Sequence, residues 1–199
     1  MNLKHFGDAY DIVKKSLLQW LAPFGPWGVH PMFTHEVSVA EAAQFSEFLG
    51  APVLSTDVLR LTSRRGGYLG ACGDCRSVFL APDTGVRLHR RQRHRATEFV
   101  FDEELLALTV MRPDGLVMVF DQSIPRGGEA AQTQTKLDHF ARHGVSGFAY
   151  VSQACFLILS QSEQLAHVAR EQVIASSGLP DARILAVTPR GGARLSVGP

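Results

Sequence analysis

Residues 77–85 read Ser77-Val78-Phe79-Leu80-Ala81-Pro82-Asp83-Thr84-Gly85, an apolar run that ends abruptly at a proline, an acid and a glycine. Such a run is typical of a buried strand followed by a loop. A second run of the same design is Gly115-Leu116-Val117-Met118-Val119-Phe120-Asp121-Gln122-Ser123, and a helix-like segment, 101–110, lies between the two. The pattern predicts a strand, helix, strand unit with an aspartate just past each strand, which is where open α/β sheets usually place their chemistry.

The rest of the chain adds helices and strands on both sides of this unit. Apolar spacing predicts helices from about residue 8 to 21 and over 38–49, 99–110, 129–143 and 162–177. Short apolar runs predict strands over 27–34, 147–151, 154–159 and 183–187, and the middle two form a hairpin. We therefore expect an α/β fold: one three-layer domain over residues 1–188, with a mostly parallel sheet and a C-terminal-half β-hairpin, followed by a disordered tail over 189–199.

Composition narrows the class of protein. The chain has 199 residues, 45% of them hydrophobic, and a net charge of +1, so attraction for nucleic acid must come from a local patch. Three cysteines do not make a disulfide framework, and no run reaches the roughly 18 apolar residues of a membrane span. The N-terminus lacks the apolar core of a signal peptide. We expect a cytoplasmic protein without a membrane partner, and the sequence leaves its oligomeric state open.

Acidic residues are the first candidates for a site. If the strands before Asp83 and Asp121 are parallel neighbours, both carboxylates lie at one edge of the sheet, where such pairs hold magnesium or manganese. Asp8 is a possible third metal ligand, and Asp11 and Lys15 are possible catalytic partners of the two acids. Each aspartate also has a structural interpretation, because acids after strands form turns and Asp8 suits a helix N-cap.

A basic stretch follows the first of these strands. Residues 86–95 read Val86-Arg87-Leu88-His89-Arg90-Arg91-Gln92-Arg93-His94-Arg95. Charge of one sign at this density favours an exposed loop, and phosphate backbones are its usual partners. The candidate nucleic-acid contacts are Arg87, Arg90, Arg91, Arg93, Arg95 and Arg126. The alternative interpretation is a solvated loop that binds nothing.

Three functions fit these patterns. The favoured one is a metal-dependent nuclease or phosphodiesterase acting on nucleic acid, in which Asp83 and Asp121 bind the metal and the arginines bind phosphates. A non-catalytic nucleic-acid- or partner-binding module would use the arginines alone. An S-adenosylmethionine-dependent nucleic-acid methyltransferase is suggested by Ala81-Pro82-Asp83, which has a distant likeness to the Asp-Pro-Pro type motif of some such enzymes. No glycine-rich turn after an early strand is present to hold the methyl donor.

Two local motifs have simpler interpretations. Ser38 and Glu41 have the spacing of a capping box at the start of a helix. Cys72 and Cys75 have the spacing of a metal or redox pair, but structural zinc needs a second pair, so we interpret them first as two ordinary thiols.

Three segments together resemble a known group of sequences: Gly7-Asp8-x-Tyr10-Asp11-x-x-Lys14, then Pro31-Met32-Phe33-Thr34, and then Phe79-Leu80-Ala81-Pro82-Asp83-Thr84-Gly85. They look like a family of uncharacterised bacterial α/β proteins, over roughly the first half of the chain. Its relatives often have Asp-Pro-Asp where this chain has Ala81-Pro82-Asp83. The resemblance implies no function, and Ala81 implies either a lost activity or an acid that was never needed.

Overall fold

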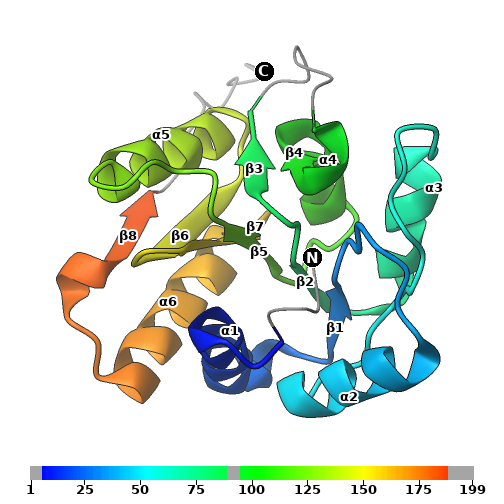
Figure 1. Ribbon diagram of the computed structural model, residues 1–199. Helices are drawn as coiled ribbons and strands as arrows, with labels where there is room; N and C mark the ends of the chain where they lie inside the picture. Colours follow the sequence, from blue (N-terminus) through cyan, green and yellow to red (C-terminus); the bar gives the residue numbers. More distant parts are fainter. Residues whose placement is uncertain (1–5, 89–94, 188–199) are drawn as a thin grey trace, which may run out of the picture.

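The computed structural model describes residues 6–88 and 95–187 (Figure 1). The helices in it are α1 (Ala9–Trp20), α2 (Val39–Leu49), α3 (Arg65–Gly70), α4 (Asp102–Val110), α5 (Glu129–Arg142) and α6 (Glu163–Ser177). The strands are β1 (Trp27–His30), β2 (Ser77–Leu80), β3 (Gly85–Arg87), β4 (Phe99–Phe101), β5 (Val117–Asp121), β6 (Ser146–Val151), β7 (Cys155–Ser160) and β8 (Ile184–Val187). Short 3₁₀ turns are η2 (Ala22–Phe24), η3 (Ala71–Asp74), η4 (Ala96–Glu98) and η5 (Asp181–Arg183).

Six strands form the main sheet, in the order β1-β2-β5-β7-β6-β8. β1, β2 and β5 are parallel neighbours, whereas β7 is antiparallel to both β5 and β6, and β8 is antiparallel to β6. β7 follows β6 in the chain yet lies between β5 and β6. The sheet is therefore mixed, and its parallel half consists of β1 together with β2 and β5, the two runs that the sequence singled out.

The sheet continues beyond β1 for a few residues. Val53 forms a parallel bridge with Val29, the Val29 amide donates to the Pro52 carbonyl, and the Leu54 amide donates to the Val29 carbonyl. The chain thus leaves β1, passes through α2 to the outer side of β1, and returns to β2 on the inner side.

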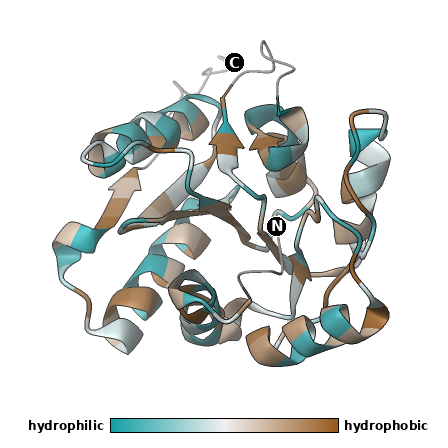
Figure 2. Ribbon diagram, viewed as in Figure 1, coloured by the Kyte–Doolittle hydropathy of each residue, from teal (hydrophilic) through white to brown (hydrophobic). Residues whose placement is uncertain are grey.

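Side chains of the strands alternate between two hydrophobic clusters, one on each face of the sheet. Phe79, Met118 and Phe120 pack with α1, α2 and α6, whereas Val78 and Val119 pack with α3, α4 and α5. Figure 2 shows mostly brown strands at the centre of the molecule and helices in which teal and brown residues alternate. Because both faces are covered, β2 and β5 are buried throughout, as continuous apolar runs predict.

Two helices begin at the capping residues that the sequence predicts. Asp8 caps α1, since its side chain accepts hydrogen bonds from the Tyr10 and Asp11 amides. Ser38 and Glu41 form the capping box of α2. Both predictions are confirmed, and each N-cap stabilises its helix by about 1 kcal/mol.

Some boundaries differ from the prediction. Phe99–Phe101 belongs to strand β4, which pairs in parallel with β3 in a separate two-stranded sheet, so the helix expected from residue 99 begins at Asp102. All three residues of β4 are buried, and this burial outweighs the helical spacing of the residues that follow.

The α/β class is confirmed, and within the described residues no helix is long and apolar enough to cross a membrane. The single-domain assignment of residues 1–188 stays a prediction. The tail over 189–199 lies outside the described residues.

Candidate functional site

The carboxyl ends of β1, β2 and β5 lie side by side because the three strands are parallel neighbours. The Ala81 amide, just past β2, donates to the carbonyl of His30 at the end of β1 (3.1 Å). The backbone amide of Gln122, just past β5, donates to the Thr84 carbonyl (2.9 Å). Ligands of open α/β sheets bind outside this edge, so the candidate site is built from here.

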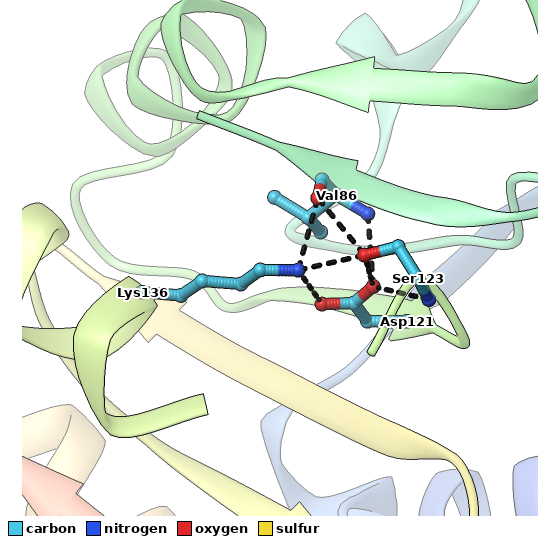
Figure 3. A network of polar contacts seen from close by, with 4 residues as sticks. All are labelled: Val86, Asp121, Ser123 and Lys136. Carbon is cyan, nitrogen blue, oxygen red and sulfur yellow. Dashed lines mark hydrogen bonds and ion pairs between the residues drawn. The ribbon is translucent and has the colours of Figure 1, made fainter. Parts of the chain in front are cut away.

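Asp121 ends β5 inside a buried polar network (Figure 3). Its Oδ1 accepts from the amides of Val86 and Ser123, each at 3.1 Å, and from Ser123 Oγ at 2.6 Å. Its Oδ2 forms an ion pair with Lys136 Nζ from α5, and the Asp121 side chain is 0% exposed. Both carboxylate oxygens therefore have partners within the protein.

Lys136 is equally engaged. Besides Asp121, its Nζ donates to the Val86 carbonyl (2.9 Å) and to Ser123 Oγ (2.8 Å), which accounts for the three hydrogens of the ammonium group. Gly85 makes room for this arrangement, because a Cβ at that position would lie 2.1 Å from Asp121 Oδ1. The network connects β3 to β5 and α5, and in the sequence β3 is followed by the arginine-rich residues up to Arg95.

A metal ion does not fit Asp121 as it stands, because it would have to displace Lys136 or the donors on Oδ1. Asp83 lies partly buried in the loop between β2 and β3. Across residues 6–88 and 95–187, no group of three or more His, Cys, Asp or Glu side chains is placed to hold a metal ion. The predicted magnesium or manganese ligands Asp83, Asp121 and Asp8 stay a prediction, and no chemical step is derived through a metal.

The acid of α1, Asp11, lies on the other side of the sheet from Asp121. Asp11 is buried, pairs with Lys14 (2.7 Å), and accepts from the Gly7 amide (2.9 Å). Lys14 Nζ lies 4.6 Å from the centre of the Phe120 ring. Since Phe120 and Asp121 are consecutive strand residues, they point to opposite faces of the sheet. Asp11 is thus separated from Asp121 by the sheet.

Lys15 is also away from this edge. Its Nζ lies over the Phe48 ring (4.8 Å), and it lines a pocket of about 440 Å³ beside Gly25 and Trp27, at the start of β1.

Two of the predicted nucleic-acid-binding arginines contact the protein itself. Arg87 stacks on the Phe99 ring, with its guanidinium carbon 3.7 Å from the ring centre, and Arg95 forms an ion pair with Glu98. Arg126 is exposed in the loop before α5. Arg90, Arg91 and Arg93 lie outside the described residues.

A polar pocket lies next to the end of β1, on the side of Val53. It has a volume of about 660 Å³ and is lined by Glu36, Thr56, Asp57, Val58, Arg60, Ser63, Arg64, Gly67 and Tyr68. Tyr68 Oη donates to the Asp57 carbonyl (3.3 Å), and Arg60 pairs with Glu36 (3.2 Å). Burial, together with the Asp57 carboxylate, raises the pKa of Tyr68, so the phenol remains a hydrogen-bond donor at neutral pH.

His30 connects this pocket to the sheet. Its Nε2 lies 3.1 Å from the Tyr68 carbonyl, and its Nδ1 lies 3.4 Å from the Met32 amide, which donates to it. This pattern assigns the hydrogen to Nε2. Burial lowers the pKa of His30, which keeps the ring neutral. Met32 follows with a positive φ of 51°, a conformation that non-glycine residues rarely adopt and that often marks functional turns.

Sequence reasoning did not select Asp57, Ser123, Tyr68 or Lys136 as site residues. The sequence does carry a weak indication for Asp57, since it follows a short apolar stretch, as Asp83 and Asp121 do. It carries none for Lys136, which stands among the polar residues of α5.

Comparison with protein-family models, with curated proteins and with solved structures found no match for this chain.

Proposed function

We propose that this protein is an S-adenosylmethionine-dependent nucleic-acid methyltransferase. Its methyl donor, a nucleoside-containing small molecule, would bind in the pocket beside β1. The observation that carries the proposal is the path of the chain around β1. Because the chain goes from β1 to Val53 on one side and to β2 on the other, the strand order reverses at β1. Open α/β sheets bind their ligands at the carboxyl ends of strands at such a reversal.

Asp57 has the place expected for a ribose ligand. In dinucleotide-binding sheets an acid at the end of the second strand, about 20 residues after the first turn, binds the ribose hydroxyl groups. Asp57 follows the Val53 segment, which is parallel to β1, and it lines the pocket. Tyr68 and Arg64 line the same pocket and supply a flat ring and a cation for the rest of the ligand.

The neighbouring strand supplies the second half of the proposed site. Some nucleic-acid methyltransferases end their fourth strand in an Asp-Pro-Pro type motif that holds the target amine. β2 lies beside β1 and leads into Ala81-Pro82-Asp83. Farther along the same sheet, β7 lies antiparallel between β5 and β6. In this proposal the protein is a three-layer domain with β6 and β7 as a hairpin.

The proposed reaction needs a methyl donor, a nitrogen atom that accepts the methyl group, and residues that bind the nucleic acid. A nucleobase nitrogen would attack the sulfonium methyl group, the carbon–sulfur bond would break to leave S-adenosylhomocysteine, and the nitrogen would lose a proton. Asp83, at the edge beside β1, is the side chain that we assign to the target amine, and the arginine loop to the nucleic-acid backbone. Ala81 stands where the Asp-Pro-Pro type motif has its acid, and the acid of this chain comes two residues later, which predicts a slow enzyme or one dependent on Asp83 alone.

Isothermal titration calorimetry with S-adenosylmethionine and S-adenosylhomocysteine tests the proposal. We expect binding with a 1:1 stoichiometry, weakened about tenfold or more by Asp57→Asn, which removes the charge that holds the ribose. Asp181→Asn, at an exposed acid of η5, is the matched control and should bind as the wild type does. Absence of binding by the wild type, or equal binding by both variants, would contradict the proposal.

The metal-dependent nuclease and the non-catalytic binder remain predictions, and they can be tested with the wild-type protein and aspartate variants. A rise in melting temperature with magnesium or manganese that Asp83→Ala abolishes would favour the nuclease. Salt-dependent binding of nucleic acid that survives Asp57→Asn and Asp83→Ala, with no effect of S-adenosylmethionine or metal, would favour the binder.

A further inference from the structure

Cys72 and Cys75 lie three residues apart around one 3₁₀ turn. Cys72 lies within the 3₁₀ turn η3, and Cys75 is the residue that ends it. Side chains three residues apart eclipse in a 3₁₀ turn, and this spacing allows the two sulfur atoms to approach each other. Both are present as thiols; Cys72 is buried and Cys75 is partly exposed. An attacking reagent therefore meets Cys75 first.

Arg112 stands beside this pair with unused hydrogen-bond donors. The residue is only 5% exposed, and its Nη1 donates to the Leu108 carbonyl (3.2 Å). Its Nε and Nη2 are buried and have no hydrogen-bond partner among the described residues. The guanidinium interacts electrostatically with both Cys72 and Cys75. A buried donor without an acceptor is costly, and a thiolate is the acceptor that these two cysteines can supply.

We propose that Cys72 and Cys75 form a reversible disulfide by exchange with a small-molecule disulfide, and that Arg112 stabilises the attacking thiolates. The Cys75 thiolate attacks one sulfur of glutathione disulfide, forms a mixed disulfide and releases glutathione thiolate. The Cys72 thiolate then attacks the Cys75 sulfur and releases the second glutathione thiolate. Each cysteine loses one proton, and the two electrons reduce glutathione disulfide to two glutathione molecules.

The second step is the slower one. Burial raises the pKa of Cys72 to about 12, and the positive charge of Arg112 opposes this shift. Few Cys72 side chains are therefore thiolates at neutral pH, and ring closure accelerates as pH rises.

Oxidation also acts on the pocket, a consequence that rests on the proposed function. Cys75 Sγ packs against β1, where a Cβ at Gly28 would lie 2.5 Å from it. The turn η3 directly follows α3, which supplies Gly67 and Tyr68 to the pocket. A disulfide draws Cys75 Sγ away from Gly28 towards Cys72 and shifts the end of α3. We therefore expect the oxidised protein to bind S-adenosylmethionine several-fold more weakly than the reduced protein.

The test is a redox titration of the folded, full-length protein in glutathione buffers, followed by thiol counting and peptide mapping. We expect the wild type to lose two thiols and two hydrogen atoms of mass, and dithiothreitol to restore them. Cys155→Ser, at the buried cysteine of β7, is the matched control and should still form the disulfide. Cys75→Ser should form none, and Cys72→Ser should stop at a glutathione adduct on Cys75.

Arg112 is tested by the rate of ring closure at neutral pH. Arg112→Met should slow closure about tenfold because it removes the charge that stabilises the thiolate. Arg112→Lys retains the charge and should close faster than Arg112→Met, and melting curves establish that each variant is folded. A wild type that keeps both thiols, a disulfide that maps to Cys155, or equal rates for all three proteins would overturn the proposal. None of these readouts depends on ligand binding, so failure of the proposed function is seen separately.

Discussion

At the scale of single residues, the Asp121–Lys136 pair shows how a buried charge is held. Removing the ammonium would leave a fully buried carboxylate without its counter-ion, which typically costs about 3 kcal/mol. We expect Lys136→Met to lower the free energy of unfolding by that amount in urea denaturation. Arg126→Met, at an exposed cation of similar length, should change it by less than about 0.5 kcal/mol.

The double variant tests the pairing itself. Asp121→Asn combined with Lys136→Met removes both charges, so it should be more stable than Lys136→Met alone. Additive losses would mean that the two side chains stabilise the fold independently, contrary to the geometry.

Gly85 is the residue on which this network depends sterically. Its φ is 143°, and a Cβ would lie 2.1 Å from Asp121 Oδ1. Gly85→Ala should therefore destabilise the protein by about 2 kcal/mol or more, because it strains the backbone and displaces the carboxylate. A Cβ at Gly70 meets nothing within 4 Å, so Gly70→Ala should change stability by only about 0.5 kcal/mol. Equal unfolding midpoints for the two variants would contradict this account.

At the scale of elements, the sequence predicted those helix starts and strands that depend only on neighbouring residues. Ser38 and Glu41 predict the start of α2, and the continuous apolar runs predict β2 and β5, because neither depends on distant residues. The short strand β4 was not predicted, because a three-residue strand exists only through its pairing with β3. Its sequence, Phe99-Val100-Phe101, is compatible with either element.

The candidate site was predictable only in outline. That Asp121 lies at the carboxyl edge follows from the strand pattern, but its partner Lys136 stands 15 residues away on α5, and only the packing of α5 against the sheet brings the two together. Asp57 lines a pocket whose other residues include Glu36, which precedes α2, and Tyr68, which lies in α3. Contacts of this kind are set by tertiary packing and leave no local pattern.

The predicted binding of nucleic acid by the arginine-rich stretch 86–95 can be tested with a multiple variant. Arg90, Arg91 and Arg93 replaced together by alanine should weaken single-stranded nucleic-acid binding and reduce the slope of log K against log salt by about 2, since each lost phosphate contact contributes about 0.7. Fluorescence anisotropy over a salt series measures both. Alanine at Arg142, Arg170 and Arg183 is the control for lost charge, and an equal reduction there would indicate a non-specific effect of net charge.

At the scale of the whole molecule, helices cover both faces of the sheet. The ends of the strands are therefore the places where a site can form. The carboxyl edge collects the polar network of Asp121, the loop containing Asp83, and the pocket with Asp57 and Tyr68. With a net charge of only +1, the predicted attraction of nucleic acid would have to come from a local patch such as the arginine-rich stretch 86–95.

The same architecture makes global stability depend on pH through His30. Burial lowers the pKa of this histidine below its ordinary value of 6.5, so below that pH the unfolded chain binds a proton that the folded protein does not. The buried neutral ring therefore contributes no pH dependence above about pH 6.5, and stability falls as pH decreases below it, by up to about 1.4 kcal/mol per pH unit. His30→Gln has no titrating ring and retains a donor for the Tyr68 carbonyl. The difference in unfolding free energy between wild type and His30→Gln should therefore shrink between about pH 7.5 and about pH 5.5. A constant difference across this range would mean that the imidazole is protonated equally in both states and would contradict its burial as a neutral ring.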